Sequence, residues 1–251
     1  SHHLIDIVDP DEDYSLALFL RQARSAISDI QARSKLPILA GGTGQYVWGL
    51  LEGWQVPRHP PEGELREGLE RRAESEGPDL LHAELTRLDP EAAARIDRRN
   101  VRRVVRALEL ARSSPDLGRR QGVRKIAPAY DTMVLGLALE RSALYRRINS
   151  RVDAMIEGGW LEEVRALLRR GYGSGLPALS SLGYRELVEH LEGAVPLPEA
   201  VERIKGRTRR FARGQHAWFR RDDARIHWLD PSLAFDEAEG LVKGWLDRKP
   251  L

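Results

Sequence analysis

A glycine-rich turn, Gly41-Gly42-Thr43, is the first place where this sequence could do chemistry. It follows a short apolar run at residues 37–40 and precedes a segment with helical character at residues 44–51. Glycines let a backbone approach a phosphate, and the free N–H groups at a helix start attract anions. A threonine hydroxyl adds another donor. The turn therefore suggests an anion-binding site, although the same residues also suit an ordinary strand-to-helix connection.

A run of cations between residues 201 and 221 is the second candidate, because eight lysines and arginines accompany the single acid Glu202. The cations are Arg203, Lys205, Arg207, Arg209, Arg210, Arg213, Arg220 and Arg221. The whole chain has a net charge of only +2, so this helix concentrates positive charge. Arginines with aromatic neighbours such as Trp218 and Phe219 are typical of RNA-binding faces. The alternative is a solvated helix face whose charges are neutralised by acids elsewhere in the fold.

Two shorter segments carry similar signals. Residues 100–108 form an amphipathic helix that leaves Arg102, Arg103 and Arg106 off the apolar stripe of valines and leucine. Together with the later basic helix, this segment suggests a cleft with cationic walls. A glycine before Tyr184 and Arg185 could bring both side chains to a phosphate or a base, although a plain helix start would look the same.

Composition narrows the class of protein. The chain has 251 residues, 41% of them hydrophobic, which is enough for a large core. It has no cysteine, so disulfides and thiolate metal ligands are excluded, in keeping with a reducing cytoplasm. No apolar run approaches the roughly 20 residues that a membrane span needs. We therefore expect a cytoplasmic protein without membrane contact, and a monomer by default.

The spacing of apolar residues predicts the helices and strands that position these candidate residues. A helix N-capped by Ser15, a buried strand at 37–40 and a helix at 44–51 indicate an α/β unit with a parallel sheet. Residues 62–114 read as short helices, one opened by Asp89-Pro90 and another capped by Asn100. Further strands are expected at 132–139 and 225–229, and further helices at 142–157, 161–170, 184–191, 198–219 and 233–246. The sequence therefore predicts an α/β core at 1–55 and 129–251 with a mainly helical insertion at 56–128.

Ordered matches along nearly the whole chain resemble the tRNA dimethylallyltransferase (tRNA isopentenyltransferase) family. The matching stretches are HHLID (residues 2–6), Asp9-Pro10, Tyr14-Ser15, GGTGQY (41–46), LLEG (50–53), Asp89-Pro90 with AARI (93–96), RRVVRALE (102–109), LGYRE (182–186), TRRFAR (208–213) with Gln215, and WFR (218–220). Two positions depart from the family pattern: Gly214 stands where arginine is usual and Ala217 where threonine is common. The resemblance implies a sheet core like that of P-loop kinases, with a helical insertion that binds the tRNA anticodon stem-loop. It implies transfer of a dimethylallyl group from dimethylallyl diphosphate to N6 of adenosine 37, with Mg²⁺ as cofactor.

The resemblance also implies roles for individual residues. Thr43 would lie at the reaction centre, touching the adenosine or the diphosphate, with Gly41 and Gly42 beside it. The substrate site would also include Tyr184, Arg185, Thr208, Arg209 and Arg210. The tRNA-contacting set would be Thr43, Arg66, Arg102, Arg103, Val104, Val105, Arg106, Leu182, Gly183, Tyr184, Arg185 and Arg213.

The family's phosphate-binding loop and its Asp-Ser segment, which holds the expected general base, have no counterpart in these residues. From the sequence we therefore expect the chain as given to be inactive alone. Two rival functions stay open. One is an isopentenyltransferase acting on free adenine nucleotides, which would have no use for an RNA-binding insertion. The other is an RNA-binding protein derived from the enzyme that has lost catalysis.

Overall fold

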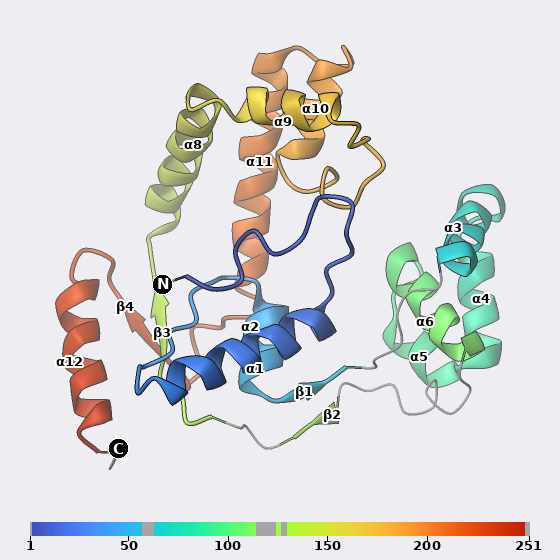
Figure 1. The fold of residues 1–251 in the computed structure, drawn as a ribbon. Helices are drawn as coiled ribbons and strands as arrows, with labels where there is room; N and C mark the ends of the chain where they lie inside the picture. Colours follow the sequence, from blue (N-terminus) through green and yellow to red (C-terminus); the bar gives the residue numbers. More distant parts are fainter. Residues whose placement is uncertain (1, 57–62, 114–123, 127–129, 249–251) are drawn as a thin grey trace. The chain divides into compact units, whose positions relative to one another are not determined.

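The computed structural model describes every residue except 1, 57–62, 114–123, 127–129 and 249–251, and divides the chain into two compact units (Figure 1). The core unit combines Ser1–Leu51 with Ala129–Leu251. The helical unit is Glu52–Pro128.

A small parallel sheet marks the core unit. Strand β3 (Val134–Leu137) pairs with β4 (Ile226–Leu229), in a register that sets Val134 opposite Ile226 and Leu137 opposite Leu229. Both strands and a parallel sheet were predicted from the sequence, but the pairing of these two strands with each other was not. The helices of this unit are α1 (Leu16–Ala32), α2 (Gly44–Leu51), α8 (Arg141–Glu157), α9 (Trp160–Arg169), α10 (Tyr184–Leu191), α11 (Leu197–Gln215) and α12 (Ala234–Leu246).

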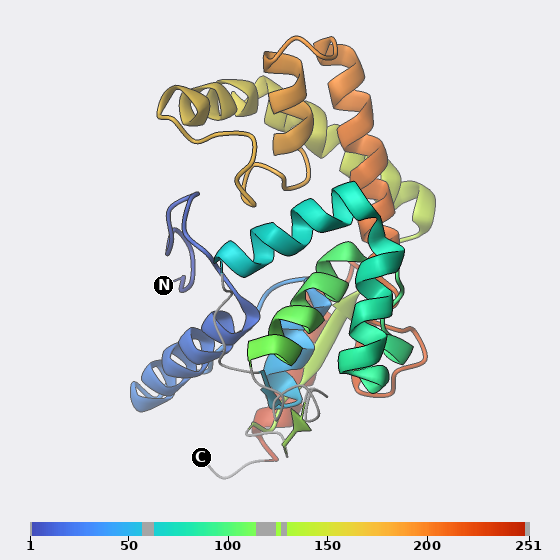
Figure 2. The same cartoon turned by 90° about the vertical axis from the view of Figure 1, so that its right-hand side faces the viewer.

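Helices α8 to α11 lie in the stretch of chain between β3 and β4 and pack together, as both views show (Figures 1 and 2). Their shared core is formed by Val152, Trp160, Val164, Leu187, Val188 and Ile204. Gly183 adopts φ +93° in front of α10, and a Cβ there would lie 2.0 Å from an atom of the Trp160 ring. Glycine is therefore required where the loop passes this tryptophan.

The prediction of a buried strand at residues 37–40 is wrong. This stretch has no strand structure, and Ile38 exposes 83% and Leu39 42% of their surfaces. A strand persists only when a neighbour satisfies its backbone hydrogen bonds, and among the described strands β3 and β4 pair with each other alone. The apolar composition of residues 37–40 suits a strand in a sheet, but it does not show whether a neighbouring strand is there to pair with it.

Helix α11 also ends earlier than expected, at Gln215 rather than near residue 219. Beyond it the chain turns tightly, with Ala217 N–H donating to the Gly214 carbonyl and Trp218 N–H to the Gln215 carbonyl. These i to i+3 bonds end the regular helix, although Phe219 N–H still donates to the Gln215 carbonyl, and Trp218 comes to lie against α2.

The helical unit is built from α3 (Gly63–Glu76), α4 (Pro78–Leu88), α5 (Pro90–Arg95) and α6 (Val101–Ser113). Its core includes Leu69, Leu81, Leu85, Val104, Val105 and Leu108. A short antiparallel ribbon, which the sequence did not reveal, pairs β1 (Trp54–Gln55) with β2 (Arg124–Lys125). The ribbon ties together the two ends of the unit, where the chain enters and leaves it.

Helix caps follow the sequence closely in both units. The Ser15 hydroxyl accepts a hydrogen bond from Leu18 N–H at the start of α1. Asp89 Oδ1 accepts from Ala92 N–H at 2.9 Å, and Asn100 Oδ1 accepts from Arg103 N–H at 3.3 Å. These caps confirm the three helix starts that short polar residues predicted. Among the described residues, no helix combines the length and the apolar character needed to cross a membrane.

We expect Leu108→Ala to destabilise the helical unit by about 2–5 kcal/mol, because Leu108 is fully buried and its loss leaves a cavity. Leu88→Ala is the matched control, since Leu88 is 51% exposed and its truncation should cost within about 0.5 kcal/mol. Urea unfolding followed by circular dichroism measures both. Equal losses for the two variants would contradict the packing described for this unit.

Candidate functional site

The glycine turn leads directly into α2. The Thr43 carbonyl accepts hydrogen bonds from the N–H groups of Tyr46 and Val47, so Thr43 is the residue at which the helix begins. Gly41 and Thr43 are exposed, and the Thr43 hydroxyl has no hydrogen-bond partner among the described residues. The Thr43 hydroxyl is therefore exposed to solvent at the start of a helix, a position that favours an anion.

The end of α11 holds this turn in place. Gln215 Nε2 donates to the Gly42 carbonyl at 3.0 Å, and Trp48 Nε1 donates to the Trp218 carbonyl at 2.8 Å. A Cβ on Gly44 would lie 2.2 Å from Cγ of Trp218, so only glycine permits the approach. The glycines here serve close packing of the protein as well as access to the backbone. Sequence reasoning gave Gln215 no role, because a contact across 173 positions leaves no local signal.

An arginine held by a carboxylate covers the other side of Trp48. The Arg225 guanidinium lies 4.1 Å from the Trp48 ring centroid. Arg225 also donates to both carboxylate oxygens of Asp223, at 2.9 Å to Oδ1 and 2.6 Å to Oδ2. Hydrogen bonds from the Arg225 side chain and backbone lower the pKa of Asp223 to about 2. Asp223 therefore fixes the arginine that packs on α2.

Acids neutralise the first half of the cation run on α11. Arg203 pairs with Glu189 and Glu199, and Lys205 pairs with Asp153 and Glu202. Arg207 donates to Glu186, which is 2% exposed and also accepts from Gly183 N–H at 2.9 Å. For these three cations, neutralisation by nearby acids is the correct interpretation.

The second half of the run keeps its charge. Arg209 donates to the neutral Asn149 side chain at 2.6 Å. Arg210 and Arg213 are exposed and have no partner among the described residues. The Thr208 hydroxyl donates within the helix, to the Ile204 carbonyl. Uncompensated positive charge thus collects on the part of α11 that runs toward Gln215 and the glycine turn.

The remaining two cations of the run lie beyond α11. Arg220 pairs with Asp222, and Arg221 lies 4.8 Å from the ring centroid of Trp228. Aromatic surface accompanies the uncompensated arginines instead, since Phe211 is 55% and Trp218 40% exposed. Guanidinium groups beside exposed rings suit phosphate and base contacts.

The segment from Leu182 to Arg185 makes contacts of its own. Leu182 packs partly buried against the core of α8 to α11. The Tyr184 hydroxyl donates to Glu163 Oε1 at 2.5 Å, and burial together with this bond raises its pKa to about 12. Arg185 is exposed and pairs with Glu189 at 2.9 Å. The polar groups of Tyr184 and Arg185 thus contact α9 and α10 rather than the glycine turn.

In the helical unit, the candidates separate into exposed and buried side chains. Arg102 and Arg103 are exposed, without a partner among the described residues. Val104 and Val105 are each 1% exposed within the core, so their side chains support α6 and do not reach a ligand. Arg66 and Arg106 both donate to Glu109, at 3.1 and 3.2 Å. An acid at position 109 amid the apolar residues 107, 108 and 110 was a sequence signal that went unused.

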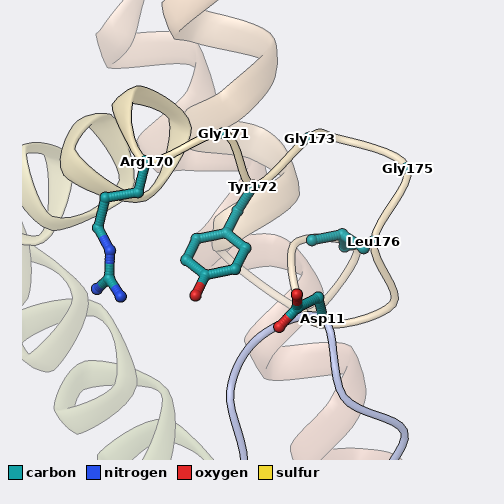
Figure 3. Close-up of a pocket in the computed structure, with 7 residues that line it drawn as sticks. All are labelled: Asp11, Arg170, Gly171, Tyr172, Gly173, Gly175 and Leu176. Carbon is teal, nitrogen blue, oxygen red and sulfur yellow. The ribbon is translucent and has the colours of Figure 1, made fainter.

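An open cavity of about 360 Å³ lies in the core unit. Figure 3 shows Arg170 and Tyr172 on one side of it and Asp11 with Leu176 on the other. Its lining residues are Asp11, Arg170, Gly171, Tyr172, Gly173, Gly175 and Leu176. The Asp11 carboxylate would repel an anion, and the Arg170 guanidinium already lies over the Tyr172 ring at 5.3 Å. This cavity is therefore a poor site for a diphosphate.

The described residues offer no protein-held metal site. Among them, no three His, Asp or Glu side chains lie close enough together to hold a metal ion. Mg²⁺ prefers oxygen ligands from carboxylates, phosphates and water. The described residues therefore do not fit an Mg²⁺ ion held by the protein itself.

Comparison with known proteins shows which family the chain belongs to. A family model described as IPP transferase matches residues 1–222. The chain is 50% identical to the tRNA dimethylallyltransferase of Thermomicrobium roseum over 233 residues, which cover 91% of this chain and 69% of the relative. It is 51% identical to that of Roseiflexus castenholzii over 221 residues, covering 88% of this chain and 72% of the relative. The chain belongs to the IPP transferase family.

Solved structures of the IPP transferase family agree with the fold. The full-length tRNA isopentenylpyrophosphate transferase of Bacillus halodurans is 37% identical and superposes with a TM-score of 0.66, covering 98% of this chain and 77% of its own. A eukaryotic dimethylallyltransferase acting on tRNA is 26% identical with a TM-score of 0.77, covering 100% and 66%. The helix-rich fold with a small parallel sheet is thus that of a tRNA IPP transferase.

Asp223→Asn should remove a pH-dependent part of the stability of this IPP transferase chain. The folded pKa of Asp223, about 2, lies below its ordinary value of 3.8. The stabilisation is therefore present above pH about 4 and is lost as pH falls toward 2. We expect the variant to unfold at lower urea than the unsubstituted chain at pH 6, with the gap closing toward pH 2. A gap independent of pH would contradict the ion pair with Arg225.

Proposed function

We propose that this chain acts in a tRNA dimethylallyltransferase, which transfers a dimethylallyl group from dimethylallyl diphosphate to N6 of adenosine 37 in the anticodon loop. Identity of 50–51% to relatives named as tRNA dimethylallyltransferases is the observation that carries the proposal. The placement of uncompensated arginines on the part of α11 that leads to an exposed helix start supports it in physical terms.

Transfer of the dimethylallyl group requires that the negative charge of the leaving diphosphate be neutralised. In the transfer, the bond between the allylic carbon and the diphosphate oxygen breaks, and a bond from N6 to that carbon forms. The diphosphate leaves with the electron pair, and N6 gives up a proton to a base. Fixed donors that meet the developing negative charge lower the barrier. The N–H groups at the start of α2, together with Arg209, Arg210 and Arg213, are the donors that we assign to this task.

Thr43 is the residue we place nearest the reacting atoms. Its hydroxyl is exposed at the beginning of α2, where it could donate to the diphosphate or touch the adenosine. Gly41 and Gly42 would let the phosphate approach the backbone. The adenosine must leave its stack to reach such a site, which costs a few kcal/mol that binding has to offset. Mg²⁺ would bind chiefly to the diphosphate oxygens and water and would help to neutralise their charge, because the described residues contain no group of three His, Asp or Glu side chains that could hold it.

We further propose a fold of the P-loop nucleotide kinase kind for the core unit, with β3 and β4 as members of its parallel sheet. Helices connecting two parallel strands are typical of such sheets. The helical unit would then be the insertion that binds the anticodon stem-loop. Arg102 and Arg103, exposed and unpaired among the described residues, are its most available phosphate contacts. An enzyme for free adenine nucleotides would have no use for them.

Binding of the chain to an anticodon stem-loop with adenosines at positions 36, 37 and 38 tests the proposed partner. A second stem-loop with position 37 replaced is the control, and both are measured over a salt series. We expect the adenosine loop to bind more tightly, with log K falling by about 0.7–0.9 per phosphate contact for each tenfold rise in salt. Equal binding of both loops would favour a general RNA-binding protein, and no binding at low salt would contradict the RNA assignment.

The diphosphate site is tested separately with inorganic diphosphate as the probe. We expect it to raise the melting temperature of the chain, and the double variant R210Q/R213Q to lose most of that shift. Arg203→Gln is the matched control, because Arg203 lies on the same helix but is paired with Glu189 and Glu199. Loss of the shift in the control, or its retention in the double variant, would contradict the assignment of Arg210 and Arg213.

A further inference from the structure

The open cavity of the core unit is lined by polar side chains whose hydrogen-bonding groups have no protein partner in the described part of the chain. Neither oxygen of the Asp11 carboxylate accepts a hydrogen bond or joins an ion pair there, and the Tyr172 hydroxyl makes no hydrogen bond there. The Arg170 guanidinium lies over the Tyr172 ring and pairs with no acid among the described residues. All three groups are therefore available to a ligand.

The loop beside the cavity leaves space for such a ligand. Gly173 and Gly175 line the cavity, and a Cβ on either glycine would meet no atom within 4 Å. The cavity volume of about 360 Å³ falls in the range of roughly 300–1,000 Å³ that is usual for small-molecule sites. One planar ring system with its substituents is a ligand of suitable size.

Figure 3 shows how the polar groups lie around this space. In that view the Tyr172 ring lies between Arg170 and Asp11, and the Asp11 carboxylate points toward the side of the cavity that holds the tyrosine. Leu176 lies beside Asp11 and adds apolar surface. The cavity thus combines an aromatic ring, an aliphatic side chain and a carboxylate acceptor.

The charges of the lining favour a neutral group. Asp11 is the one acid and Arg170 the one cation among the lining residues. The carboxylate opposes an anion and the guanidinium opposes a second cation, because like charges at close range repel each other. A neutral, flat group that carries N–H donors satisfies the aromatic ring and the carboxylate together.

The two oxygens of Asp11 select among the neutral, flat groups of nucleic acids. A carboxylate binds most strongly to two parallel N–H donors, one for each oxygen. Guanine presents such a pair, its N1–H and its N2 amino group. Adenine and cytosine place a ring-nitrogen acceptor beside their amino group, and uracil places a carbonyl on each side of its N–H. Each of these three bases would turn an acceptor toward the carboxylate.

We propose that this cavity binds a guanine base, supplied by a free guanine nucleotide or by an unpaired guanosine of an RNA. The Tyr172 ring stacks on the base, and Asp11 accepts hydrogen bonds from N1–H and from the N2 amino group. Unpaired bases that stack on aromatic side chains and bond through their edges are the usual targets of sequence-specific RNA recognition. The residues assigned above to dimethylallyl transfer take no part, so the inference stands apart from the proposed function.

Titration of the chain with the 5′-monophosphates of guanosine (GMP), adenosine, cytidine and uridine tests the base preference by calorimetry. We expect GMP to bind about tenfold more tightly than each of the others. Asp11→Ala should abolish this preference. Asp13→Ala is the matched control and should keep it, because Asp13 is exposed in the same segment but does not line the cavity. Each variant removes one negative charge, so electrostatics alone would affect both alike.

The stacking contact is tested at Tyr172. We expect Tyr172→Ala to weaken GMP binding about tenfold and Tyr172→Phe to retain it, because the phenylalanine ring stacks equally well. Melting temperatures show whether the variants are folded. Asp11 is exposed, so D11A carries the test even where Y172A fails to fold.

A uridine oligomer with a single guanosine distinguishes the two sources of the base. Displacement of bound GMP by the oligomer at lower concentration than by GMP itself assigns the cavity to RNA, and displacement no better than by GMP assigns it to a free nucleotide. Equal binding of the four nucleotides, a guanine preference that survives D11A, or no binding of GMP at millimolar concentration would overturn the inference. Displacement of GMP by arginine amide as readily as by GMP would overturn it as well, since a guanidinium also offers paired donors.

Discussion

The close approach of the α2 start to the end of α11 is the contact on which the core unit's candidate site depends. Gln215 bonds to the Gly42 carbonyl, Trp48 bonds to the Trp218 carbonyl, and Gly44 leaves no space between its backbone and the Trp218 ring. A side chain at Gly44 would push the two segments apart, because its Cβ would lie 2.2 Å from Cγ of Trp218. Because they meet, the start of α2 lies beside the end of α11, the helix that carries Arg210 and Arg213.

The positions of acidic side chains determine which cations on α11 are neutralised and which keep their charge. Glu186, Glu189 and Asp153 contact the first half of α11 and neutralise it, whereas no acid among the described residues contacts Arg210 or Arg213. A net charge of +2 is therefore compatible with a strongly anion-attracting surface. Paired arginines hold helices together, and unpaired ones are available to a ligand. Helix α11 therefore carries arginines of both kinds.

Two buried carboxylates do related work in the two units. Glu186 joins the Gly183 backbone to Arg207, which fixes the start of α10 against α11. Glu109 joins Arg66 to Arg106, which fixes α3 against α6. In each unit the arginine keeps part of its surface exposed, so the acid restricts its motion without removing it from solvent. Each buried acid thus joins two segments of its unit through a charged hydrogen bond.

The sequence by itself determined where most of the helices lie, the caps at Ser15, Asp89 and Asn100, strands within residues 132–139 and 225–229, and the family. These features rest on local periodicity and short motifs. Only the tertiary structure decided that residues 37–40 form no strand, and which arginines stay unpaired among the described residues. Strand pairing and ion pairing join residues far apart in the chain. Which strands and which charged groups pair depends on how the chain folds in space. The spacing of residues along the sequence does not show this.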